Sequence, residues 1–261
     1  MFTKKELLDA VKDGLYQSWR LAFATNDTPY VSMKPEYLTT IMLGKCLSEK
    51  LSVGKFIVRF EEPTKDVATR AFPLMPLPYI PKNVFGRASK ETGEEGLVDI
   101  VIYRKTPSFP ETVAVIEVKN FNQRDDLLAR DLDRNREFME LTDLRKKNQI
   151  NYGVLTFFLH DKKSRTKEEA SSFVAEKARH FQALANNYRS AATSVTLILD
   201  TLVNFPRLSN AEAALGADEN EQPAIDVEEN HHIVYGIICI ERKSSRQFNA
   251  DLGGAERLSA G

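Results

Sequence analysis

The stretches Gly96-Leu97-Val98-Asp99-Ile100-Val101-Ile102-Tyr103 and Val113-Ala114-Val115-Ile116-Glu117-Val118-Lys119 decide the fold of this chain. Both are short and rich in valine and isoleucine, which predicts two β-strands rather than helices. Each strand carries an acid within its apolar run, Asp99 in the first and Glu117 in the second. Because a buried charge is costly without a partner, these two acids indicate a functional site.

Side-chain alternation along a strand places Glu117 and Lys119 on one face and Val118 on the other. Asp99, on the neighbouring strand, can reach the same place. Two carboxylates and the backbone carbonyl of Val118 are hard oxygen ligands of the kind that Mg²⁺ prefers. Lys119 would then orient or deprotonate a water molecule and stabilise a charged transition state.

Asp99, Glu117, Val118 and Lys119 together resemble the signature of the PD-(D/E)xK nuclease superfamily. The family often has proline directly before its aspartate, and Val98 stands there in this chain. The resemblance covers roughly residues 30–160. It implies a restriction-endonuclease-like fold, hydrolysis of DNA phosphodiester bonds, and Mg²⁺ as cofactor with Mn²⁺ as a substitute.

Three further residues are candidates near this signature. Many members of the family supply an extra metal-binding acid from the helix before the sheet, and Glu36 resembles that residue. The alternative is that Glu36, in a first helical turn, only complements the helix dipole. Asn120 and Gln123, directly after the signature, are candidates for orienting water or phosphate.

Arg130 and Arg134 are candidate nucleic-acid contacts on the predicted helix after Lys119. They are four residues apart and share a helix face. In similar nucleases this helix lies beside the substrate groove. The competing interpretation, which residue composition favours, is a solvated face with ion pairs to neighbouring acids, namely Asp131, Asp133 or Glu137.

Hydrophobic periodicity and breaker residues predict the remaining elements. Expected helices span residues 3–24, 35–51, 124–147 and 166–187, and further strands span 55–61, 152–160, 194–203 and 232–241. Five prolines between residues 62 and 95 predict mostly loop or short pieces. This order predicts an α/β fold with a mixed central β-sheet flanked by helices. We interpret residues 1–242 as one restriction-endonuclease-like domain, with N-terminal helices and C-terminal strands added to its core.

The charge is unevenly distributed along the 261 residues. The net charge is −1, but residues 207–230 carry seven acids and one base, which leaves the remainder mildly basic. With few large apolar groups, this segment is predicted to be a mobile acidic loop. Residues 243–261 are predicted to be a disordered tail. A mildly basic body permits contact with phosphate but does not require it.

Several classes of protein are disfavoured. No apolar run is long enough to cross a bilayer, and the N-terminus does not resemble a secretory signal. We therefore expect a cytoplasmic protein in which Cys46 and Cys239 are reduced core thiols. The chain has no phosphate-binding loop, no glycine-rich dinucleotide signature and no zinc-ligand spacing, so no nucleotide cofactor is expected.

The leading hypothesis is a Mg²⁺-dependent deoxyribonuclease with DNA as its partner. Asp99, Glu117 and Lys119 would be catalytic, while Asp99, Glu117, Val118 and Glu36 would hold the metal. One alternative is a subunit that keeps the nuclease fold for binding or assembly, in phage defence or DNA processing, with weak or no catalysis. A nuclease toxin is another. At the residue level, Glu117 and Lys119 could instead form a surface ion pair. Sequence leaves open a homodimer or a protein partner.

Overall fold

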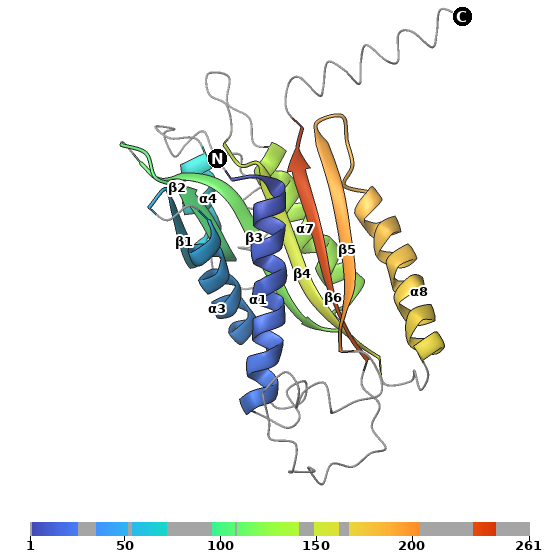
Figure 1. The fold of residues 1–261 in the computed structure, drawn as a ribbon. Helices are drawn as coiled ribbons and strands as arrows, with labels where there is room; N and C mark the ends of the chain where they lie inside the picture. Colours follow the sequence, from blue (N-terminus) through green and yellow to red (C-terminus); the bar gives the residue numbers. More distant parts are fainter. Residues whose placement is uncertain are drawn as a thin grey trace, which may run out of the picture.

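A computed structural model shows a mixed β-sheet between two layers of helices (Figure 1). It describes residues 2–25, 35–51, 54–71, 96–107, 109–140, 149–161, 167–203 and 232–243. The helices are α1 (Lys4–Thr25), α3 (Pro35–Lys50), α4 (Thr64–Ala71), α7 (Asp125–Glu140) and α8 (Lys167–Asn186). The strands are β1 (Phe56–Pro63), β2 (Leu97–Arg104), β3 (Glu111–Phe121), β4 (Tyr152–Asp161), β5 (Thr193–Val203) and β6 (His232–Arg242).

The six strands lie in the order β1-β2-β3-β4-β6-β5. Strand β2 pairs antiparallel with both β1 and β3, whereas β3 and β4 are parallel. A parallel pair requires a crossover, which α7 provides between the end of β3 and the start of β4. The sheet is completed by β6 and β5, which continue antiparallel from β4.

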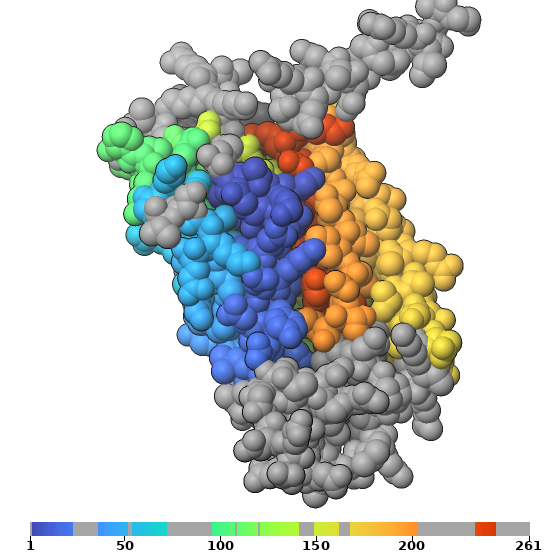
Figure 2. All heavy atoms as spheres, viewed as in Figure 1, coloured from blue at the N-terminus to red at the C-terminus, as the bar shows by residue number. Residues whose placement is uncertain are grey.

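Each face of the sheet has its own hydrophobic core. Residues of α4, α7 and α8 pack on one face, with Val115 of β3 and Leu155 of β4 among the buried strand residues. Residues of α1 and α3 pack on the other face, together with Ile116 and Val118 of β3. In the space-filling view, α1 and α3 cover the left of this second face and β5 is visible to the right of α1 (Figure 2). Strand β4 is buried along its whole length, as expected for a central strand covered on both sides.

The expected α/β class and mixed sheet are confirmed, and so are most elements, with ends that differ by a few residues. At the start of α1, the backbone N–H of Thr3 donates to Glu6 Oε2 at 2.7 Å, and the N–H of Glu6 donates to Thr3 Oγ1 at 3.2 Å. This is the capping box that the sequence predicts. Cys46 and Cys239 are buried free thiols, also as predicted.

Within residues 62–95, which are expected to be mostly loop or short pieces, residues 64–71 form the short helix α4. Val67, Ala68 and Ala71 provide its apolar face, which packs on the sheet. The hydroxyl of Thr112 in β3 donates to the carbonyl of Val67 at 3.0 Å and fixes this helix. The expected acidic loop at 207–230 and the tail beyond residue 243 lie outside the described residues. None of the described helices has the length and apolar character needed to cross a membrane.

Candidate functional site

The site lies where β2 and β3 stop pairing. Their antiparallel register runs to Ile100 and Ile116. Beyond this pair, the side chain of Asp99 links the two strands. Its Oδ2 accepts a hydrogen bond from the backbone N–H of Val118 at 2.7 Å. The hydrogen bond holds Asp99 beside the strand segment that carries Glu117.

Glu117 is fully buried, with an exposure of 0 %. It follows Val115 by strand alternation and therefore faces α7, where Arg134 Nη2 lies 2.5 Å from Glu117 Oε2. This contact is an ion pair, and neither oxygen of Glu117 has a hydrogen-bond partner by geometry among the described residues. Burial raises the pKa of Glu117 well above its usual value, although the positive charge of Arg134 opposes the rise.

Lys119 lies two residues further along β3 and is directed to the same helix. Its Nζ is 3.2 Å from Asp131 Oδ2. Burial lowers the pKa of Lys119, but Asp131, followed by Glu117 and Asp99, outweighs burial and raises it overall. Lys119 is therefore a stable ammonium group that donates hydrogen bonds, and the water-orienting role fits it better than that of a base.

A β-bulge follows Val118. Val118 pairs with Thr156 of β4, and Phe121 pairs with Phe158, so β3 contains one residue more than its partner in this interval. Bulges change the direction of a strand and often lie beside functional sites. Beyond it, Asn122 has a φ of 50°, and its side chain exchanges two hydrogen bonds with the backbone of His160, at 3.0 and 3.1 Å.

Glu36 reaches the same cluster from the first turn of α3, a helix that packs on the opposite face of the sheet. Burial raises the pKa of Glu36, Lys119 opposes this rise, and Asp99 and Asp131 add to it. Glu36 is thus within electrostatic range of Lys119, Asp99 and Asp131. Its acidic side chain is therefore available to the site as well as to the dipole of α3.

Helix α7 contributes two residues that complete what we call the ionic cluster. Asp131 is buried, with an exposure of 6 %, and its two carboxylate oxygens contact Lys119 and Arg134, the latter at 3.1 Å. Arg134 is thus engaged with Glu117 and Asp131 instead of forming a solvated face with Arg130, which is exposed. The ionic cluster comprises Glu36, Asp99, Glu117, Lys119, Asp131 and Arg134.

Sequence reasoning considered Asp131 only as a partner for surface arginines. The available signal was its position in the buried stripe of α7, beside Leu128 and Leu132. Asn135, one turn later in the same stripe, is also buried and donates to the carbonyl of Val154 in β4 at 3.2 Å. Polar residues at core positions of an amphipathic helix indicate that the facing strand offers polar partners.

The other predicted candidates are not members of the ionic cluster. Val118 is buried in the core on the α1 side, as strand alternation predicts. Gln123 follows β3 and precedes α7, and Asn120 lies in β3 with a side chain outside the described residues. The structure therefore brings Asp99, Glu117 and Lys119 together with the α7 residues Asp131 and Arg134, and Glu36 interacts with this group electrostatically.

The ionic cluster contains the kinds of side chain that bind a divalent cation. The arrangement of these side chains fits a metal site only partly. Four of the six groups are acids and two are bases, and both buried oxygens of Glu117 lack a donor among the described residues. A buried acceptor of this kind commonly marks a bound ion or water. However, no three Asp, Glu, His or Cys side chains within the described ranges are placed to hold a metal together. Arg134 lies on the carboxylate of Glu117 that a metal would use.

Comparisons of the chain with protein-family models, curated proteins and solved structures gave no match. The function of this chain is therefore inferred from its own residues and their geometry.

Proposed function

We propose that this chain is a divalent-metal-dependent nuclease that hydrolyses DNA phosphodiester bonds at the ionic cluster. The observation that carries the proposal is the fully buried Glu117, whose two oxygens lack hydrogen-bond donors among the described residues, between Asp99 and Lys119. A charged group is retained in such a place at a cost in stability, which is typical of functional sites.

The arrangement of elements supports the proposal. The resemblance to PD-(D/E)xK nucleases implies a helix, three strands, a second helix and a fourth strand. The corresponding elements are α3, β1, β2, β3, α7 and β4, with α4 inserted after β1. The acids and the lysine lie at the point where β2 and β3 separate, and an acid from the preceding helix reaches them.

In the proposed mechanism, Asp99, Glu117 and the carbonyl of Val118 would hold Mg²⁺, with Glu36 as a further acid. The bound ion would supply polarisation of the phosphate and neutralisation of transition-state charge. Lys119, kept protonated by its acidic neighbours, donates a hydrogen bond that orients water or a phosphate oxygen. Asp131 fixes the position of the Lys119 ammonium group.

Replacement of Lys119 tests this assignment. Lys119→Ala should abolish cleavage of linear, circular and single-stranded DNA with Mg²⁺ or Mn²⁺ while Mn²⁺ binding persists, because Lys119 is not a proposed ligand. Lys45→Ala is a matched control, since Lys45 is exposed on α3 and pairs only loosely with Glu49, at 4.0 Å. Cleavage by Lys119→Ala at the wild-type rate would refute the mechanism.

A binding or assembly subunit with the same fold is the second candidate. The contact between Arg134 and Glu117 favours it, because an internal cation already neutralises the carboxylate. The two functions differ in their response to metal, since a ligand that binds only the native state raises its apparent stability. An unchanged melting temperature in Mg²⁺ and Mn²⁺, with no cleavage, would favour the binding subunit.

A further inference from the structure

Arg134 has three separate partners in the interior of the site. Its Nη2 lies 2.5 Å from Glu117 Oε2 and 3.1 Å from Asp131 Oδ1, and its Nη1 donates to the carbonyl of Leu97 at 3.3 Å. The side chain is 27 % exposed, whereas that of Glu117 is 0 % exposed. One edge of the guanidinium is thus buried against Glu117 while part of the side chain still reaches solvent.

A metal ion and this guanidinium would repel each other at Glu117. Charges in a protein interior are poorly screened, so two cations on one buried carboxylate repel each other strongly. Arg134 contacts Oε2 of this carboxylate, so a cation at Oε1 would share the carboxylate with the guanidinium at an electrostatic cost. Occupation of Glu117 by Arg134 therefore opposes its occupation by a divalent cation.

The contacts of Arg134 with Asp131 and Leu97 would allow a divalent cation to replace it at Glu117. If the guanidinium leaves Glu117, it retains the ion pair with Asp131 and the hydrogen bond to the Leu97 carbonyl, and it is not left as an unpaired charge. Partial exposure of the side chain gives it room to move outward. Lys119 does not have to move, because it contacts the other oxygen of Asp131.

We propose that Arg134 is an internal competitor of the divalent cation for Glu117, and that it thereby sets the metal affinity of the site. This inference rests on the proposed function, since it presupposes a metal site at Glu117. Without the metal, Arg134 offsets the negative charge of the Glu117 carboxylate. With the metal bound, the guanidinium would move away from Glu117 and keep its contacts with Asp131 and the Leu97 carbonyl.

The test is the affinity for Mn²⁺ alone, measured by isothermal titration calorimetry at pH 8, where protons compete least for carboxylates. Arg134→Met and Arg134→Gln should bind Mn²⁺ roughly tenfold more tightly than the wild type, the scale of one lost charge-assisted contact. The glutamine variant retains an amide donor for Glu117, so it guards against misfolding of the methionine variant. Thermal unfolding checks that each variant is folded.

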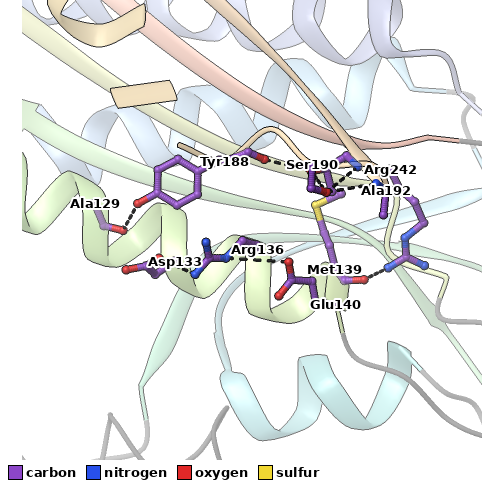
Figure 3. A network of polar contacts seen from close by, with 10 residues as sticks. Ala129, Asp133, Arg136, Met139, Glu140, Tyr188, Ser190, Ala192 and Arg242 are labelled. Carbon is purple, nitrogen blue, oxygen red and sulfur yellow. Dashed lines mark hydrogen bonds and ion pairs between the residues drawn. The ribbon is translucent and has the colours of Figure 1, made fainter. Parts of the chain in front are cut away.

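Arg136→Met is the matched control. Arg136 lies on the same helix but belongs to another network, in which it contacts Asp133 at 3.0 Å and Glu140 at 4.0 Å and lies over the ring of Tyr188 (Figure 3). Its removal subtracts the same charge without touching Glu117. Because solvent and salt screen its more distant charge, the Mn²⁺ affinity should stay within about twofold of the wild type.

The outcomes separate this inference from the proposed function. Tighter binding by both Arg134 variants and not by Arg136→Met supports the competition. Equal or weaker binding by folded Arg134 variants, with measurable binding by the wild type, overturns the competition and leaves the metal site intact. If neither the wild type nor any variant binds Mn²⁺, the proposed metal-dependent function fails, and the competition fails with it.

Discussion

Replacement of the buried carboxylate Glu117 by glutamine should make the protein more stable at neutral pH. Burial raises the pKa of Glu117 well above its usual value despite the nearby Arg134. Glutamine has nearly the same shape and carries no charge. In the variant, Arg134 keeps its ion pair with Asp131 at 3.1 Å, so no uncompensated cation results. The wild type alone must either keep a proton on Glu117 that the unfolded chain releases or bear the cost of an ionised carboxylate in the core.

The size of the effect follows from proton linkage. Above about pH 4.3, the usual pKa of glutamate, the unfolded wild type loses the proton that the folded protein still holds at Glu117. Stability of the wild type relative to Glu117→Gln should therefore fall by about 1.4 kcal/mol for each pH unit, until the pH reaches the raised pKa of the folded state. Above that pH the difference should stay constant, with the variant the more stable protein.

Urea unfolding of both proteins between pH 4.5 and 8, in the presence of a chelator, measures this difference. Glu111→Gln is the control, because Glu111 lies near the start of β3 and accepts a hydrogen bond from Arg104 Nε at 2.9 Å. Loss of that charge-assisted bond should destabilise the protein at pH 7. A Glu117→Gln variant that loses stability relative to the wild type as the pH rises would refute the reasoning.

Three further predictions concern the fold. Gly236→Ala should destabilise the protein by about 1 to 3 kcal/mol in urea unfolding, because a Cβ there would lie 2.2 Å from Cζ of the buried Phe157 ring; an unchanged midpoint would show that the core adapts. Asn122→Ala should lower the free energy of unfolding by about 2 kcal/mol or more, because it loses two hydrogen bonds and keeps a left-handed backbone. Asn122→Gly should lower it by about 1 kcal/mol less, because glycine adopts this backbone without strain. A glycine variant no more stable than the alanine variant would show that backbone strain is irrelevant. Cys46 and Cys239 should react with a thiol reagent only after unfolding, and rapid labelling of the native protein would contradict their burial.

Local chemistry explains which elements were predictable. Thr3 and Glu6 form their capping box within one helical turn, and the valine-rich runs around Asp99 and Glu117 form strands as their composition predicts. The sequence predicted only loop or short pieces around the prolines of residues 62–95, and it did not identify α4 as a helix. Its apolar face of Val67, Ala68 and Ala71 is too brief to give a periodic signal.

The site was predictable only in part. Strand alternation placed Glu117 and Lys119 on one face, and both contact residues of α7. The partner of Lys119 could not be foreseen, because Asp131 meets it only through the packing of α7 on β3. The proximity of Glu36 likewise depends on how α3 lies against the opposite face of the sheet, and no spacing in the sequence encodes that distance.

The extra residue between Val118 and Phe121 has a consequence for how this strand could change by deletion. Both residues belong to the core on the α1 side, with one position too many between them for regular alternation. Removal of Asn120 would restore a regular strand with Phe121 still facing inward, so core packing does not demand the present length. Selection for hydrophobic burial alone would be indifferent to this insertion. The insertion instead bears on the direction of the strand end next to Lys119, because a bulge bends the strand that contains it.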